Sequence, residues 1–317
     1  FSTISGGVAV FNYLAVPMRR ICWLKCSIIV YFPVAETEYR CQDLIEAAKR
    51  GDIICVIKLL GEGADPNIRD ERGRTPLHYA VKYGPGVVRT LLRNGADPDV
   101  ADDSGTTPLH IAAMLRRHDV VQLLLDYSKS SGRRLNVNVQ DESGKTPLHL
   151  AATYCHPNVM WLLLVNGAKP NIRDNSGETP LHKAAHYMTC VDGVKMLLEA
   201  GADPNARRYD TNRTPLHYAA MHGNTRMVTL LLKYGVDPNV QDYKGLTPLH
   251  YAVMRRRPDA VKLLLQHGAD PTIRDNEGKT PIDHAREAGY TDILRILMER
   301  TATSKTQTRR SRKAVLA

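Results

Sequence analysis

Apolar residues along the chain come in paired helical runs separated by short polar segments. In residues 246–271, for example, the run that begins "LTPLHYAV" is followed by "AVKLLL" and then by "GADP". Thr-Pro-Leu-His opens each first run, with spacings of 32, 39, 33, 35 and 33 residues, at Thr75, Thr107, Thr146, Thr179, Thr214 and Thr247. A pattern that recurs with a period near 33 residues predicts a repeat protein built from pairs of short helices.

The two ends of this series differ from its middle. One period upstream of Thr75, the segment "CQDLIEAAKRGD" keeps the helical pattern but has polar Gln42 and Asp43 in place of the tetrapeptide. One period downstream of Thr247, the tetrapeptide becomes "TPID", beginning at Thr280. Because terminal units of a repeat array need a polar outer face, we expect these two units to cap the series.

The tetrapeptide has the chemistry of a helix start. Thr is a favoured N-cap, and Pro suits the first helical turn, where its missing N–H costs no hydrogen bond. A glycine follows each second run, as at Gly95 and Gly235, where a left-handed residue would end the helix. Two helices this short cannot form a core alone, so neighbouring units must stack on one another.

These residues resemble the ankyrin repeat, whose period is 33 residues and whose units are a β-turn followed by two helices with a TPLH-type start. The resemblance implies an all-α fold, an ankyrin-repeat α-solenoid of helix-turn-helix pairs joined by β-hairpin loops. It covers residues 38–300 as eight units, including both caps. Residues 1–37 are then an N-terminal extension of uncertain status, and 301–317 form a basic tail that we expect to be disordered.

Positive charge is concentrated at the ends of the chain. The net charge is +10, from 43 Lys and Arg against 33 Asp and Glu. Three of the bases fall in residues 1–35 and five in 301–317, and neither segment holds an acid. The repeat region is therefore nearly neutral and lacks the basic face expected of a nucleic-acid-binding domain. Nucleic acid remains a candidate partner only through the 305–313 cluster.

Histidine recurs at the fourth position of the tetrapeptide, as at His149 and His250. A solenoid places these residues in a row, one repeat apart, whereas catalysis and metal binding need groups that converge. The resemblance implies instead that each histidine bonds to neighbouring backbone and ties repeats together. We predict no catalytic residues, no metal, no cofactor and no enzymatic activity. The six cysteines show no zinc spacing, and we expect free thiols in a reducing compartment.

Arginine replaces glycine in two of the turns between paired helices. Gly84 and Gly223 occupy this position in two repeats, whereas Arg116 and Arg256 occupy it in "MLRRHD" and "MRRRPD". A residue other than glycine costs about 1 kcal/mol there if the backbone stays left-handed. Two interpretations remain open, namely drift on a solvated loop and a basic patch for an acidic partner.

The residues seven and eight positions after each Thr fall on the exposed side of the first helix. Ankyrin repeats usually bind partners on their concave surface, which is made from this side and the hairpin tips. Here these positions carry Tyr, Met and His, which are residue types that favour interfaces. The predicted partner-binding residues are Tyr83, Met114, Tyr154, His186, Tyr187, Met221, His222, Tyr243, Met254 and Arg255.

We therefore predict a non-enzymatic scaffold that is monomeric and binds one protein or peptide in this groove. The alternative is a nucleic-acid- or chromatin-associated protein that uses its basic C-terminal tail. A cytoplasmic location is expected, with nuclear import through Arg309–Lys313 as one alternative. Secretion or membrane association is another, because residues 18–36 resemble a signal segment. An insertion around 127–135 accounts for the longest repeat and is expected to be an exposed loop.

Overall fold

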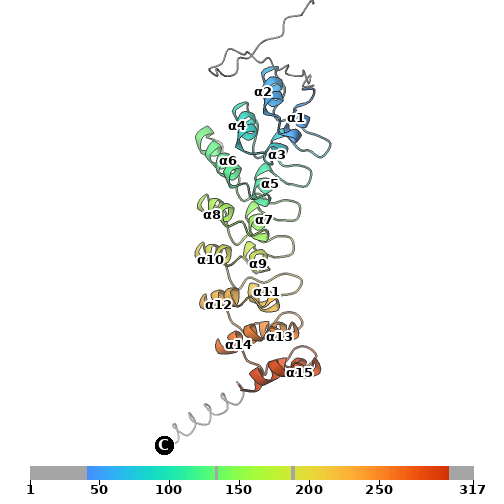
Figure 1. The fold of residues 1–317 in the computed structure, drawn as a ribbon, viewed down its shortest axis with the longest axis vertical. Coiled ribbons are helices and arrows are strands. Elements are labelled where there is room, and N and C mark those ends of the chain that lie inside the picture. Colours follow the sequence, from blue (N-terminus) through green and yellow to red (C-terminus); the bar gives the residue numbers. More distant parts are fainter. Residues whose placement is uncertain (1–40, 133–134, 187–189, 300–317) are drawn as a thin grey trace, which may run out of the picture. The chain divides into compact units, whose positions relative to one another are not determined.

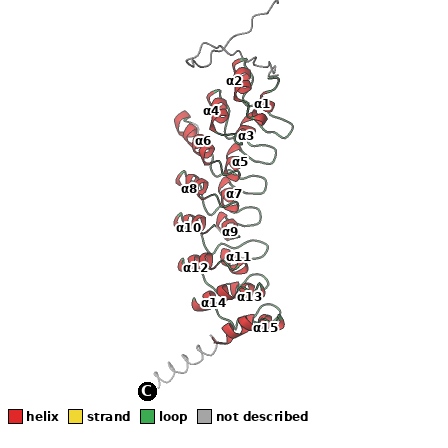
Figure 2. Cartoon of the chain, viewed as in Figure 1, coloured by secondary structure: helices red, strands yellow, loops and turns green. Residues whose placement is uncertain are grey.

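The computed structural model describes residues 41–132, 135–186 and 190–299, which form a stack of helix pairs (Figures 1 and 2). The first helices of the pairs are α1 (Leu44–Arg50), α3 (Pro76–Ala80), α5 (Pro108–Met114), α7 (Pro147–Thr153), α9 (Pro180–Ala185), α11 (Pro215–His222), α13 (Pro248–Met254) and α15 (Pro281–Glu287). The second helices are α2 (Ile53–Gly61), α4 (Pro85–Arg93), α6 (His118–Ser131), α8 (Pro157–Val165), α10 (Val191–Glu199), α12 (Thr225–Lys233) and α14 (Pro258–Gln266), and residues 291–299 are also helical.

The helices lie in two rows. First helices contact the first helices of neighbouring repeats, and second helices contact second helices. The buried apolar residues form one cluster that runs from Leu44 to Leu297, with no division into separate domains. The predicted all-α solenoid is confirmed. The predicted N-terminal extension (1–37) and basic tail (301–317) lie outside the described residues.

Hairpin loops join the repeats, and no strand occurs in the parts of the chain just given. Each loop is closed by its own backbone: in the first, the N–H of Asp70 donates to the carbonyl of Arg74 (3.0 Å). The tips are also bonded to one another, because the N–H of Asp103 donates to the carbonyl of Arg72 in the preceding loop (3.0 Å). Gly73 turns the hairpin at φ 70°, which is a left-handed conformation that glycine tolerates best.

The insertion around 127–135 is not simply an exposed loop, as the sequence suggested. Helix α6 continues through Ser131, so that it has 14 residues, whereas α8 has nine. No glycine or proline interrupts "DYSKSS", and the helix ends only at Gly132, which is left-handed at φ 70°. The half-buried Tyr127 packs against the core and holds this extra turn in place.

Candidate partner-binding surface

The tetrapeptide histidines bond to two repeats at once. The backbone N–H of each Thr donates to the Nδ1 of the histidine three residues later, at 3.0–3.2 Å in the six repeats. The Nε2 of the same ring lies 3.0–3.3 Å from a backbone carbonyl at the end of the next hairpin. The prediction that these histidines tie repeats together is confirmed.

These contacts also fix the protonation state of the rings. A backbone N–H can only donate, so Nδ1 carries no proton, and a carbonyl can only accept, so Nε2 carries one. The ring is therefore neutral. Burial agrees with this state, since it lowers the pKa of His149, His182 and His217 from 6.5 to about 4. A general base for chemistry near neutral pH would need a free nitrogen, and these rings have none.

One histidine of the row lies close to two other possible metal ligands. Single ligand atoms of His250, Asp275 and His284 all lie within 4.8 Å of one another. However, the His250 ring already bonds to Thr247 and to the carbonyl of Lys279, and His284 Nε2 is paired with Asp275 (2.7 Å). A metal ion could bind here only if His250 and His284 gave up these hydrogen bonds. The arrangement therefore favours a structural role in packing the last repeats over metal binding.

The turns between paired helices connect neighbouring repeats. Arg117 and His156 donate side-chain N–H groups to the carbonyls of Lys82 and Met114, both at 3.0 Å. Arg257 does the same toward the carbonyl of Met221, at 3.5 Å. Each carbonyl lies at the end of the first helix one repeat earlier. These three turn residues are therefore structural.

Two arginines of these turns keep the left-handed backbone that glycine adopts most easily. The φ angles of Arg116 and Arg256 are 59° and 49°. Arg256 also lies 3.7 Å from Asp292 and over the ring of Tyr290. Arg255 is exposed like its neighbours, but its guanidinium makes no side-chain hydrogen bond or ion pair within the described ranges, and only its backbone N–H is bonded, to the carbonyl of Tyr251 (3.0 Å).

We define the stripe as the residues seven and eight positions after each Thr, from Lys82 to Arg255. Its large apolar side chains are well exposed: Tyr83 43%, Leu115 42%, Tyr154 49% and Met254 42%. Met114, His186, Met221 and His222 are half-buried, and Lys82 and Arg255 are exposed. Tyr187 lies outside the described residues. The opposite side of the same helices is buried in the continuous core.

The two exposed tyrosines of the stripe are held in place by their neighbours. The hydroxyl of Tyr83 donates to the carbonyl of Lys49, and its ring packs against Gly51 of the preceding repeat. Tyr154 stacks on His156 with ring centroids 6.0 Å apart. An aromatic side chain that is already fixed loses little entropy when a partner binds, so both suit a role as anchors.

The second half of the stripe is a cluster of histidine and arginine. The rings of His186 and His222 lie 5.7 Å apart, and His186 also packs on Tyr218 at 4.0 Å. Burial lowers the pKa of His222, and the neighbouring His186, Arg257 and Arg255 lower it further, which favours the neutral ring. The positive potential of this region therefore comes from Arg255 and Arg257, and it would attract an anion.

Tyr243 lies away from the stripe, at a hairpin tip, where it is 61% exposed. Its N–H donates to the preceding tip at Thr211 (3.0 Å). Tyr209 is its equivalent one repeat earlier, 58% exposed, and sequence analysis missed it. Two extra residues make that repeat 35 residues long and hide the alignment. Matching "RRYD" with "VQDY" by the turn residues would have revealed it.

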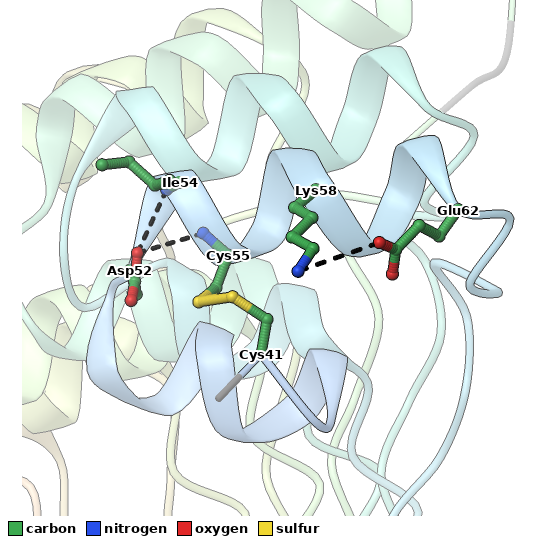
Figure 3. The surroundings of a disulfide bond; sticks show 6 residues. All are labelled: Cys41, Asp52, Ile54, Cys55, Lys58 and Glu62. Atoms are coloured by element: carbon green, nitrogen blue, oxygen red, sulfur yellow. Dashed lines mark hydrogen bonds and ion pairs between the residues drawn. A yellow bond between two sulfur atoms is a disulfide. The ribbon is translucent and has the colours of Figure 1, made fainter. Parts of the chain in front are cut away.

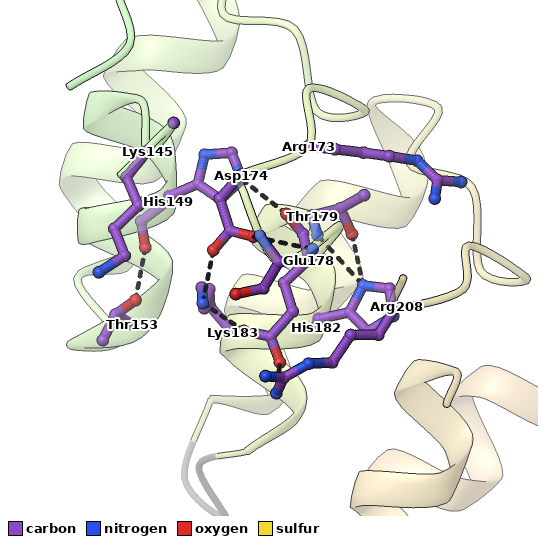
Figure 4. Close-up of polar contacts among 12 residues, drawn as sticks. Lys145, His149, Thr153, Arg173, Asp174, Glu178, Thr179, His182, Lys183 and Arg208 are labelled. Atoms are coloured by element: carbon purple, nitrogen blue, oxygen red, sulfur yellow. Dashed lines mark hydrogen bonds and ion pairs between the residues drawn. The ribbon is translucent and has the colours of Figure 1, made fainter. Parts of the chain in front are cut away.

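A buried ion-pair network joins the fifth and sixth repeats (Figure 4). Lys183 lies 2.8 Å from Asp174 and also pairs with Glu178, while Arg208 lies 3.0 Å from Glu178. Burial alone would raise the pKa of Glu178, but His186, Lys183 and Arg208 outweigh it, and the pKa is lowered well below its usual range. Every charge has a partner, so the network stabilises the stack and leaves no acid free for catalysis.

Four cysteines form disulfides, so the expectation of free thiols throughout was wrong. Cys41 is bonded to Cys55 in α2, beside Asp52, which caps that helix (Figure 3). Cys155 and Cys190 are bonded between adjacent repeats, with Cα atoms 5.3 Å apart. Their separation of 35 residues is close to one repeat period, and this is why stacking brings them together.

The second helices carry a competing surface. A groove of about 500 Å³ lies along α6, α8 and α10, and Trp161, 54% exposed, is its largest apolar side chain.

No helix in the described part of the chain is long and apolar enough to span a membrane.

The stacked helix pairs and the histidine row define an α-helical repeat protein whose exposed stripe is available for contacts. The chain belongs to the ankyrin repeat family, whose model matches residues 44–135, 131–208, 207–275 and 245–308. Ankyrin repeats are protein-interaction modules, and this chain is built from such repeats.

Individual relatives match the chain over stretches of different length. An ankyrin repeat protein of Pyrobaculum aerophilum is 41% identical over 189 residues, which is 59% of this chain and 66% of the relative. A fowlpox virus ankyrin repeat protein is 56% identical over 46 residues (14% of this chain, 7% of the relative). An ankyrin repeat and LEM domain-containing protein 1 homolog of Caenorhabditis elegans is 49% identical over 59 residues (19% and 8%). The chain thus spans less than two thirds of each of these relatives.

Proposed function

We propose that the chain is a non-enzymatic scaffold that binds a protein or peptide partner along the stripe. The observation that carries this proposal is the two-sidedness of the first helices. Their inner side is buried, whereas Tyr83, Leu115, Tyr154 and Met254 remain 42–49% exposed. Apolar and aromatic side chains that are exposed in register, on a rigid support, favour a binding surface.

The most direct test is affinity capture with matched variants. The intact chain, Tyr154→Ala and Trp161→Ala would be compared as baits in the same lysate. Tyr154 and Trp161 are exposed aromatics of one repeat on opposite rows of helices. We expect partners of the intact chain to be lost or strongly reduced with Tyr154→Ala and retained with Trp161→Ala. The reverse result would assign the partner to the groove on the second helices.

The alternative function is nucleic-acid binding through the cluster at 305–313. Its support is the sequence "KTQTRRSRK", which contains five bases and no acid. Phosphate contacts release counterions, so such binding should fall steeply as salt rises, whereas apolar anchors respond weakly. If deletion of residues 301–317 abolishes binding to a captured partner and Tyr154→Ala does not, the alternative replaces the proposal.

The compartment is also a proposal. The two disulfides favour an oxidising environment, and so they support the secreted alternative over a cytoplasmic location. Alkylation of the native protein without reductant, followed by mass spectrometry, tests this. Protection of Cys41, Cys55, Cys155 and Cys190 is expected, and full modification of all four would restore the cytoplasmic interpretation.

A further inference from the structure

Within the six TPLH repeats the stripe carries charge of only one sign, and the equivalent position of the last unit is Glu287, which is paired with Lys279 (2.9 Å). In the six TPLH repeats, none of its twelve positions is Asp or Glu, whereas Lys82 and Arg255 are exposed bases. The adjoining turns add Arg116 and Arg256, which are also exposed. This bias does not follow from the whole repeat region, where bases and acids are nearly equal in number.

The neighbouring surfaces do not share this bias. Hairpin tips mix both signs, with Asp103 and Glu142 at some tips and the exposed bases Arg72 and Lys244 at others, and the second helices do the same, with Asp259 and Lys262 one turn apart in α14. The stripe is thus a basic and apolar band beside surfaces of mixed charge. A partner that lies along the stripe would gain by placing its acids on the band.

The strongest attraction for an acid lies at Arg255. This guanidinium has no hydrogen-bond or ion-pair partner in the described ranges, so all its donors are available. His222 lies in the same field, and Nε2 of that ring is buried without a hydrogen-bond partner. Exposed Met254 lies beside Arg255 in the sequence and offers an apolar contact. A carboxylate can pair with Arg255 through two parallel hydrogen bonds, while an adjacent apolar side chain covers Met254.

The contacts of the tyrosines favour a protein segment over a nucleic acid. Proteins that bind single-stranded nucleic acid stack its bases on aromatic side chains. Tyr154 already stacks on His156, with ring centroids 6.0 Å apart, and Tyr83 packs on Gly51 with its hydroxyl bonded to Lys49. The cations are also few and lie repeats apart, whereas each strand of a DNA duplex carries one phosphate per ~3.4 Å of helix axis.

We propose, building on the function proposed above, that the partner is an acidic protein segment with interspersed apolar residues, and that its carboxylates pair with Arg255 and with Lys82. The apolar residues of this segment contact Tyr83, Leu115, Tyr154 and Met254. This inference adds the chemical class of the partner to the binding surface, and it assigns to Arg255 the role of selecting for that charge.

The test is selection of a phage-displayed library of random twelve-residue peptides on the whole chain. Enriched peptides would be synthesised and titrated by calorimetry against the intact protein and four variants. Arg255→Glu and Arg255→Gln probe the proposed pairing, and Arg226→Glu, an exposed arginine of α12, is the matched charge control. Tyr154→Ala probes the stripe itself. Circular dichroism would establish that each variant is folded.

We expect enriched peptides to hold more Asp and Glu than the starting library. Arg255→Glu should weaken their binding at least tenfold, Arg255→Gln about threefold or more, and Arg226→Glu less than twofold. Replacing the acids of a bound peptide by Asn and Gln should reproduce the loss. This set of results would support the inference.

Other outcomes separate the two proposals. Neutral or basic peptides that need Tyr154 but are indifferent to Arg255→Glu would overturn the charge inference and leave the proposed function standing. Peptides indifferent to both sites, or no enrichment at all, would overturn both. Displacement of bound peptide by a twenty-nucleotide polyuridylate, with polyuridylate binding lost in Arg255→Glu, would make the occupant a nucleic acid and would also overturn the inference.

Discussion

The histidine row and the stripe lie on the same short helices, yet they differ in almost every property. His149 is fully buried, and Tyr154, five residues later, is 49% exposed. The row is the same in six repeats, whereas the stripe changes from Lys82-Tyr83 to Met254-Arg255. The difference shows that one helix serves two purposes. Its buried side repeats because every interface between units is alike, and its exposed side varies because a partner is not repetitive.

The largest expected effect is a loss of folding stability in acid, and it arises in the histidine row and not in the stripe. The ordinary pKa of histidine is 6.5, and burial lowers that of His149, His182 and His217 to about 4. The unfolded chain therefore takes up protons as pH falls below 6.5, and the folded chain does not until about pH 4. Stability that is present above pH 6.5 is lost through this window, by roughly 3 kcal/mol for each histidine and on the order of 10 kcal/mol for the three.

Urea unfolding followed by circular dichroism at pH 7, 5.5 and 4.5 measures this loss. His182→Gln sharpens it, because removing one titrating ring should reduce the dependence between pH 6 and 5 by about 1.4 kcal/mol per pH unit. The lowered pKa of Glu178 acts in the same direction but only below its ordinary value of 4.5. Stability that is constant from pH 7 to pH 5 would show that the row is not buried as described.

The second expected effect concerns the bond between neighbouring repeats. Cys155–Cys190 closes a loop with a sequence separation of 35 residues. Chain-entropy estimates for a loop of this length give about 3–4 kcal/mol of stability. We expect the double variant Cys155→Ser with Cys190→Ser to lose that amount in urea unfolding, and added reductant to have no further effect at this site. If the double variant is as stable as the unsubstituted protein without reductant, the disulfide between Cys155 and Cys190 does not stabilise the stack.

A smaller effect is expected in the turns. Arg116 has a left-handed backbone at φ 59°, so Arg116→Gly should raise the free energy of unfolding by up to about 1 kcal/mol. Arg116→Ala is the control, since it removes the guanidinium but keeps the backbone cost. Equal effects of the two substitutions, measured by urea unfolding, would mean that the stability change comes from loss of the side chain and not from relief of the backbone.

Sequence reasoning reached the fold and the histidine row because both rest on residues that repeat. The Thr and His of the tetrapeptide recur in register, and one capping geometry explains all six. It also placed Tyr83, Tyr154, Met254 and Arg255 on an exposed face, although no observation yet tests them as binding residues. Tyr243 lies apart from them, at a hairpin tip.

Features that occur once were missed. Glu178 occupies a position where other repeats have Arg, Thr, Lys or Leu, so the repeat pattern did not predict its ion pairs. It pairs with Lys183 and with Arg208, which belongs to the next repeat. The Cys155–Cys190 pair does leave a signal in the sequence, because its separation is near one repeat period and stacking brings such positions together. The longer α6 was missed because its polar residues suggested a loop, whereas helix termination needed Gly132.

The most direct test of the two-sided helix compares His149→Ala with Tyr154→Ala, using stability and binding of one enriched peptide as paired readouts. We expect His149→Ala to lower the free energy of unfolding by about 1–2 kcal/mol, through lost buried hydrogen bonds, and to leave peptide affinity of the folded protein unchanged. Tyr154→Ala should leave stability nearly unchanged and weaken binding by roughly 1–3 kcal/mol. If His149→Ala weakens binding at unchanged stability, or Tyr154→Ala lowers stability without affecting binding, the division between a buried scaffold side and an exposed recognition side is wrong.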